Sequence, residues 1–134
     1  GVIKAAQARG DIAVLAELAR DVYSVEIVEP LARQAVETLA RLGYQNAHLR
    51  QADGWSGWPE QAPFDAILVT CSPSAIPSSL IEQLKVGGRM VLPVGDLYVG
   101  QQLVLVDKTV DAITQTPLLP VRFVAMSARP CCGA

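Results

Sequence analysis

The sequence has no long run of one charge and no long uninterrupted apolar segment. Lysine and arginine number 11 against 13 aspartate and glutamate residues, so the formal net charge is −2. Proteins that bind nucleic acid usually carry a basic surface, and this balance argues against such a partner. No apolar stretch reaches the roughly 18 residues that a membrane-spanning helix needs, so we expect no membrane partner either.

Cysteine and histidine are also scarce. The chain has three cysteines and one histidine, His48. An odd cysteine count, with Cys131 and Cys132 adjacent, does not suit a disulfide framework and favours a reducing compartment, so we expect a cytoplasmic protein. Zinc-ligand spacing is missing, and no metal site is predicted. We interpret His48 as a surface strand residue and Cys71 as a small core residue.

What the sequence does contain suits a folded domain. Hydrophobic residues make up 51% of the chain and charged residues 18%. A chain of 134 residues is long enough to bury a modest core, and we find no linker, repeat or low-complexity segment in it. We therefore predict a single domain over residues 1–134, in which residues 128–134 form a flexible tail.

Strand and helix patterns alternate over the first two thirds of the chain. Apolar residues recur at spacings of three and four between Leu31 and Leu42, which predicts a helix. A second helix is predicted over 77–88, closed by Gly87 and Gly88. Strands are predicted over 21–29, 46–53, 64–71, 89–95, 101–108 and 121–127. This order predicts an α/β fold with a mostly parallel sheet and an antiparallel hairpin between the last two strands.

Two acidic residues lie toward the carboxyl ends of predicted strands, where sheets of this kind bind ligands. Glu26 comes after "VYSV" and Asp53 after "AHLRQA". An acid about one βα unit into a nucleotide-binding sheet accepts hydrogen bonds from both hydroxyls of a ribose. Asp53 would accept from the adenine amino group or shape the loop, and Gly54 would let the backbone approach the ring. The alternative is that both acids are surface residues that cap loops.

Four motifs of the chain resemble, in order, those of protein-L-isoaspartate O-methyltransferases: "VYSVEIVEPLA", "LARLGYQNAHLRQADGWSGWPEQAPFDAILVT", "LIEQLKVGGRMVLPVG" with "QQLVLV", and "LLPVRFVAM". The resemblance implies a Rossmann-like sheet with S-adenosyl-L-methionine at the strand ends. It implies methyl transfer to the abnormal carboxylate of isoaspartyl-containing proteins or peptides, as a repair step. It also implies that Glu26 binds the ribose hydroxyls, Ile27 packs by the adenine, Asp53 and Gly54 line the adenine end, and Ser127 approaches cofactor and substrate.

The chain departs from the family at its beginning. Members have a loop of the form E-x-G-x-G-x-G, which aligns here with residues 2–11. The acid is Lys4, two glycines are Ala6 and Ala8, and only Gly10 remains to contact the cofactor. Alternatively, residues 4–21 form one longer helix, because alanine and arginine favour helix. The first strand of the family would then be missing or reduced to residues 2 and 3.

Members of the family also carry an N-terminal segment that meets the substrate and that has no counterpart in this sequence. The resemblance therefore implies a shortened relative or a fragment. Three hypotheses remain open: an isoaspartyl methyltransferase or its cofactor-binding part, a catalytically silent remnant that serves as a binding or interaction module, and a nicotinamide-dependent enzyme. The last is the weakest, because the sequence has no G-x-G-x-x-G motif.

Overall fold

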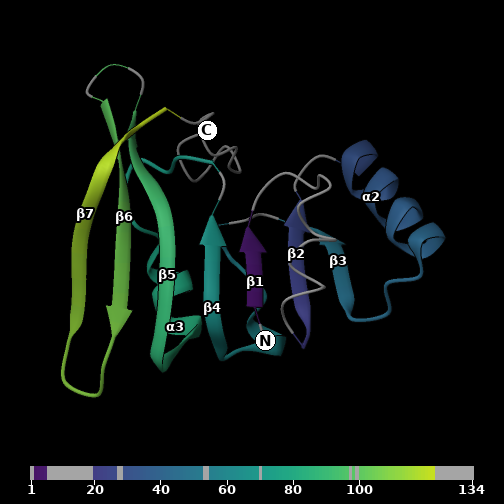
Figure 1. Cartoon of the computed structure of the whole chain (residues 1–134), viewed down its shortest axis with the longest axis horizontal. Coiled ribbons are helices and arrows are strands. Elements are labelled where there is room, and N and C mark those ends of the chain that lie inside the picture. The colour runs from purple at the N-terminus through teal and green to yellow at the C-terminus, as the bar shows by residue number, and fades with distance from the viewer. Residues whose placement is uncertain are drawn as a thin grey trace.

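The computed structural model describes residues 2–5 (backbone only), 20–26, 29–52, 55–69, 71–96, 98 and 100–122 (Figure 1). These residues form a seven-stranded sheet in the order β3-β2-β1-β4-β5-β6-β7. The strands are β1 (Val2–Ala5), β2 (Val22–Glu26), β3 (Ala47–Gln51), β4 (Phe64–Val69), β5 (Leu84–Asp96), β6 (Gly100–Lys108) and β7 (Ile113–Val121). The described helices are α2 (Glu29–Leu42), the 3-10 turn η1 (Pro59–Gln61) and α3 (Ser78–Gln83).

The sheet changes character along its width. β1 pairs in parallel with β2 and β4, β2 pairs in parallel with β3, and β4 pairs in parallel with β5. The two remaining pairs, β5 with β6 and β6 with β7, are antiparallel. The predicted α/β class and the antiparallel carboxyl-terminal hairpin are therefore confirmed, and the antiparallel part also includes β5.

Helix α2 lies over β2 and β3, and it buries only part of its predicted apolar stripe. Ala32 and Leu39 are buried, and Leu39 packs with Val22 of β2. Val36 and Leu42, in contrast, are 49% and 57% exposed. The helix is amphipathic, as a helix on one face of a sheet must be. Its apolar stripe is wider than the part of the helix that packs against β2 and β3.

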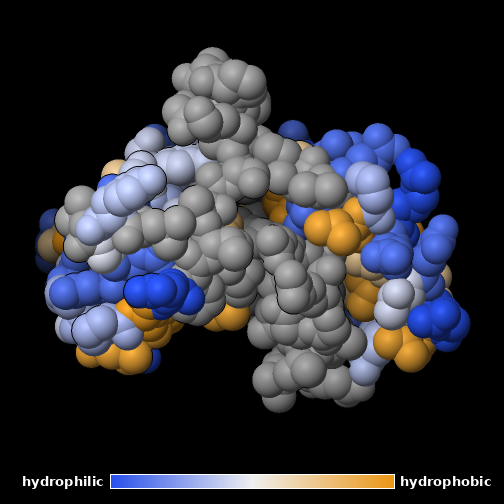
Figure 2. Space-filling view, turned by 90° about the horizontal axis from the view of Figure 1, so that it is seen from above, coloured by the Kyte–Doolittle hydropathy of each residue, from blue (hydrophilic) through white to orange (hydrophobic). Residues whose placement is uncertain are grey.

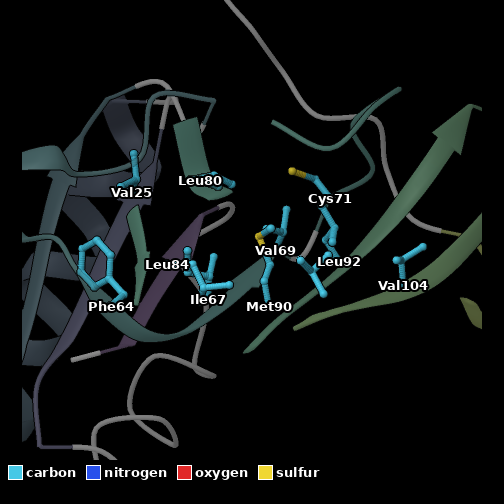
Figure 3. Packing of buried hydrophobic residues seen from close by; sticks show 11 residues of the cluster. Val25, Phe64, Ile67, Val69, Cys71, Leu80, Leu84, Met90, Leu92 and Val104 are labelled. Atoms are coloured by element: carbon cyan, nitrogen blue, oxygen red, sulfur yellow. The ribbon is translucent and has the colours of Figure 1, made fainter. Parts of the chain in front are cut away.

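The main core lies where β4, β5, β6 and α3 meet. Its largest fully buried members include Phe64, Ile67, Leu80, Met90 and Leu92. Figure 3 shows side chains of β4 and β5 gathered in the middle of this cluster. Burying each large apolar side chain contributes about 1.5–3 kcal/mol, so this cluster is the main source of stability among the described residues.

The structure corrects the expectation for the beginning of the chain. Residues 2–5, predicted as part of a loop or partly of a long helix, form β1. Lys4 and Ala5 extend the strand beyond the two residues foreseen, with Lys4 in register with Ser24 and Leu68. Pairing on both sides outweighs the helix preference of lysine and alanine. Gly10, Ala6 and Ala8 lie outside the described residues.

The second correction concerns the helix predicted over 77–88. Helix α3 ends at Gln83, and the next residues already belong to β5. The register with β4 jumps from Leu84 to Arg89, so the intervening residues form an irregularity in which Gly87 has a φ of +90°. A Cβ on Gly88 would lie 2.8 Å from the carbonyl oxygen of Asp65. The glycine pair thus marks a strand bulge rather than a helix end.

Strand β7 (Ile113–Val121) was not predicted from the sequence. It overlaps the strand predicted over 121–127 only at Val121, and Arg122 lies outside it. Strand β7 forms one edge of the sheet and, apart from its last residue, is exposed along its length. Pro117 and Pro120 lie within it, in register with Val104 and Gln102 of β6. Residues 123–127, and the tail predicted over 128–134, lie outside the described residues.

Candidate functional site

The parallel strands end together at one edge of the sheet, called the carboxyl edge from here on. Ala5 of β1 is in register with Val25 of β2 and with Val69 of β4, and the last residues of β2 and β3 are partners. The arrowheads of β1, β2 and β4 accordingly point the same way in Figure 1. Figure 2 is seen from the side of this edge, and the described residues at both ends of the sheet are mainly hydrophilic there, with smaller hydrophobic patches beside them.

Glu26 lies at the carboxyl edge, where the sequence predicted it. It is the last residue of β2 and is 2% exposed. Its carbonyl oxygen accepts a hydrogen bond of 2.9 Å from the N–H of Ala52, just after β3. A carboxylate buried at this position needs polar partners to offset its desolvation. Ile27, Asp53, Gly54, Gly10 and Ser127, the other predicted cofactor contacts, lie outside the described residues.

A second buried polar group, missed by sequence reasoning, precedes Glu26 on β2. Ser24 is fully buried, and its Oγ has no hydrogen-bond partner in the described part of the chain. Side chains alternate along a strand, so Ser24 and Glu26 share one face of β2. The stretch "VYSVE" already places a serine two residues before the acid. The serine hydroxyl becomes a candidate for binding only once its burial is known.

The loop after β3 is held by Gln83, a buried residue of α3 that no sequence pattern singled out. The N–H of Trp58 donates to Gln83 Oε1 over 2.9 Å, and Gln83 Nε2 donates to the carbonyl oxygen of Ser56 over 2.8 Å. Gly57, between them, has a φ of +63° and no room for a Cβ, which would collide with Gln83 Oε1. One amide side chain thus satisfies a donor and an acceptor of the same loop.

Aromatic rings and one arginine support the same loop from β2 and β3. Tyr23 stacks on His48 with 4.8 Å between ring centroids and meets the edge of Trp58 at 5.3 Å. The guanidinium of Arg50 lies 4.7 Å from the centroid of Trp58 and donates to the carbonyl oxygen of Gly57 over 3.0 Å. His48 also lies 3.3 Å from Asp21, and it is partly exposed. These contacts give His48 and Trp58 structural roles.

Two smaller features complete the carboxyl edge. Cys71, after β4, is 6% exposed and belongs to the main core, in agreement with its interpretation as a core residue. A pocket of about 70 Å³ lies between the end of β5, the start of β6 and the end of β7. It is lined by Asp96, Gly100, Gln101, Val121 and Arg122. Ligand sites are usually about 300 Å³ or larger, so this pocket is too small for a nucleoside.

The described residues offer neither a cluster of metal ligands nor a helix suited to span a membrane. Among the described residues, no three candidate ligands lie close enough together to hold a metal ion. None of the described helices combines the length and the apolar character that crossing a membrane requires.

Comparisons with known proteins agree on one family. The family model "Protein-L-isoaspartate(D-aspartate) O-methyltransferase (PCMT)" matches residues 10–130. Protein-L-isoaspartate O-methyltransferase 2 of Polaromonas sp. is 53% identical over 118 residues, which are 87% of this chain and 56% of that protein. The enzyme of Opitutus terrae is 57% identical over 112 residues, 84% of this chain and 48% of that protein. The chain spans about half the length of these curated relatives.

Solved structures agree with the fold. A protein-L-isoaspartate O-methyltransferase superposes with a TM-score of 0.87 at 28% identity, covering 95% of this chain and 42% of that one. A putative protein-L-isoaspartate O-methyltransferase from Plasmodium falciparum, solved with S-adenosyl-L-homocysteine, gives a TM-score of 0.76 at 22% identity over 94% of this chain and 65% of that one. The sheet is thus Rossmann-like, of the kind found in methyltransferases.

Proposed function

The chain belongs to the protein-L-isoaspartate(D-aspartate) O-methyltransferase family, and on that premise we propose that it forms the cofactor-binding part of such an enzyme. The reaction is methyl transfer from S-adenosyl-L-methionine to the isoaspartyl carboxylate of damaged proteins or peptides. The observation that carries the proposal is Glu26, a carboxylate that is 2% exposed at the carboxyl edge. The names of the relatives favour this function over a silent binding module.

Glu26 is the residue proposed to hold the ribose. Its two carboxylate oxygens suit the two hydroxyls of a ribose, and a charge-assisted hydrogen bond is about twice as strong as a neutral one. The hydrogen bond from Ala52 to the Glu26 carbonyl ties the end of β2 to the residue just after β3. A fixed backbone around the acid reduces the ordering cost of binding.

The other proposed contacts come from the family motifs. Ile27 would pack by the adenine, Asp53 and Gly54 would line the adenine end, and Gly10 would let the backbone approach the amino-acid portion. Ser127 would lie near both cofactor and substrate. The adenosine half of the cofactor would therefore meet the residue types of the family, whereas the sequence has Lys4 at the position of the family's acid on the methionine side.

Methyl transfer to a carboxylate mainly requires that the protein align the acceptor oxygen with the methyl group of the cofactor. When bound, S-adenosyl-L-methionine supplies a methyl group on a sulfonium sulfur. The isoaspartyl carboxylate is already a nucleophile, so no side chain of this chain has to remove a proton. The described residues act by holding the adenosine half and by fixing the loop after β3, and such positioning accounts for a large share of a rate enhancement. The proposal includes a cytoplasmic location, supported by the cysteine usage of the sequence.

Calorimetric titration of the 134-residue chain with S-adenosyl-L-homocysteine tests this proposal. We expect one ligand to bind per chain, and adenosine to compete for the same site. The absence of a binding signal at ligand concentrations of about 1 mM, where a weak site would still be occupied, would overturn it. Transfer of labelled methyl groups to an isoaspartyl peptide then tests the reaction, with the aspartyl form of the same peptide as the control.

A further inference from the structure

The loop that follows β3 is held by hydrogen bonds at its start and at its end, and the residue that holds its end is not among the cofactor contacts proposed above. At its start, the N–H of Ala52 donates to the carbonyl oxygen of Glu26 over 2.9 Å. At its end, Gln83 exchanges hydrogen bonds of 2.8 and 2.9 Å with Ser56 and Trp58. Only three residues, 53–55, separate Ala52 from Ser56 in the sequence.

Glutamine suits the second anchor better than other side chains do. The loop presents one N–H and one carbonyl oxygen, and a primary amide supplies one acceptor and donors at once. Gln83 is 6% exposed, so water does not readily replace either bond. A carboxylate would place negative charge beside the carbonyl oxygen of Ser56, and an aliphatic side chain would leave both backbone groups without a partner.

Gly57 fits the amide from the other side. Its φ of +63° is a conformation that side chains disfavour, and a Cβ there would collide with Gln83 Oε1. The backbone therefore approaches the amide as closely as it does because residue 57 is glycine. Such a matched contact fixes the backbone of residues 56–58 against Gln83.

We propose that Gln83 is a positioning residue for the adenosine half of the cofactor. It acts through the loop after β3 and does not touch the ligand itself. This inference rests on the proposed function, because it assumes that an adenosine moiety binds beside Glu26. A loop held before binding loses less conformational freedom when the ligand arrives, so the anchor increases affinity.

The chain carries its own probe of this loop. Its only two tryptophans, Trp55 and Trp58, both lie there, and Trp58 packs against Tyr23 and Arg50. The tryptophan emission of the whole protein therefore reports the environment of the loop. Its release would expose the indole of Trp58 to water and move the emission to longer wavelengths.

The test compares two variants of the anchor with a control of similar instability. Gln83→Leu removes both hydrogen bonds at similar volume, and Gln83→Asn is one methylene too short to make both. Val106→Ala, a fully buried site on β6, lowers stability without touching the loop. Binding of adenosine and of S-adenosyl-L-homocysteine is titrated into the wild type and each variant, and the emission is recorded without ligand.

We expect Gln83→Leu to weaken both ligands roughly tenfold, as the loss of two net hydrogen bonds implies. Gln83→Asn should weaken the binding of both ligands less. If the leucine variant does not fold, the asparagine variant is the one that tests the proposal. Both Gln83 variants should shift the emission, whereas Val106→Ala should change neither affinity nor emission. Unchanged affinity in the Gln83 variants, or an equal loss in Val106→Ala, would overturn the positioning role alone. If the wild type binds neither ligand, the proposed function is overturned, and the positioning role with it.

Discussion

The parallel and antiparallel parts of the sheet differ in length, coverage and use. Strands β1 to β4 have four to six residues each, whereas β5 has 13 and β6 and β7 have nine. β2 is almost fully buried, whereas β7 is almost fully exposed. The parallel strands bring their ends to one edge. In the antiparallel ribbon of β5, β6 and β7, strands β5 and β6 contribute to the main core, whereas β7 lies exposed.

The difference follows from how each kind of pair is connected. Parallel neighbours need crossover connections, which place covering segments on the faces of the sheet. Antiparallel neighbours need only a turn, so a ribbon can grow without being covered. The parallel strands therefore end together at the carboxyl edge, and β7, the exposed strand of the ribbon, should tolerate more change in sequence.

The largest difference between the two parts should appear in stability. Phe64→Ala removes a fully buried ring from the main core, and we expect it to lower the free energy of unfolding by about 3–5 kcal/mol. Leu119→Ala, on β7 and already 51% exposed, should cost only about 0.5 kcal/mol. Urea denaturation of both variants measures the two values. Equal losses would show that β7 is as firmly packed as the core.

The next effect concerns ligand affinity at the carboxyl edge. Glu26→Gln keeps the volume of the side chain and removes its charge, so binding of S-adenosyl-L-homocysteine should weaken at least about tenfold. Glu29→Gln is the matched control, because Glu29 is exposed on α2 and pairs with Arg33. Calorimetry on both variants gives the comparison. Similar affinities for the two would remove Glu26 from the site.

A smaller effect should separate the two halves of the ligand. The triple variant Lys4→Glu, Ala6→Gly and Ala8→Gly restores the family's residue types, and on the proposed function its acid would attract the ammonium group of the cofactor. We expect S-adenosyl-L-homocysteine to bind roughly fivefold tighter, within the 1–4 kcal/mol range of one Coulomb contact at ~4 Å. Adenosine lacks the methionine portion, and its affinity should stay the same. A parallel gain for adenosine would contradict a role of this stretch at the methionine end.

The smallest effect is expected within the ribbon. Arg89 of β5 and Asp107 of β6 are register partners joined by an ion pair of 3.1 Å, and the arginine side chain is 73% exposed. Arg89→Ala should lower the free energy of unfolding by no more than about 1 kcal/mol, and less in high salt. A double-mutant cycle with Asp107→Ala isolates the pair. A coupling energy between Arg89 and Asp107 that stays the same in high salt would contradict their description as a solvent-exposed ion pair.

The sequence predicted the elements whose patterns are local. The spacing of Leu31, Ala32 and Leu39 was enough to predict α2, and the apolar run before Cys71 was enough for β4. β7 was missed because Pro117, Pro120 and its polar residues obscure a strand that pairing with β6 stabilises. Gly87 and Gly88 were read as a helix end because the bulge depends on the register between β4 and β5, which a local pattern does not contain.

In the candidate site, too, local features were predictable from the sequence and contacts between distant segments were not. Glu26 was predictable because the end of a strand can be read from the sequence. Gln83 was not, because its partners are 25 and 27 residues away and its neighbours in the sequence read as an ordinary short helix. Ser24 resembles any strand serine until its burial is known. Contacts between distant segments decide these cases, and they follow from the fold rather than from spacing.

The prolines of β7 bear on how the protein behaves at high concentration. An edge strand offers its backbone groups as a template on which the strand of another molecule can add, and such addition starts fibrils. Proline has no N–H, so Pro117 and Pro120 each remove one donor from β7. The missing donors interrupt the hydrogen bonding that a strand of another molecule would need along this edge. This disfavours growth of an intermolecular sheet even though Leu118 and Leu119 are exposed.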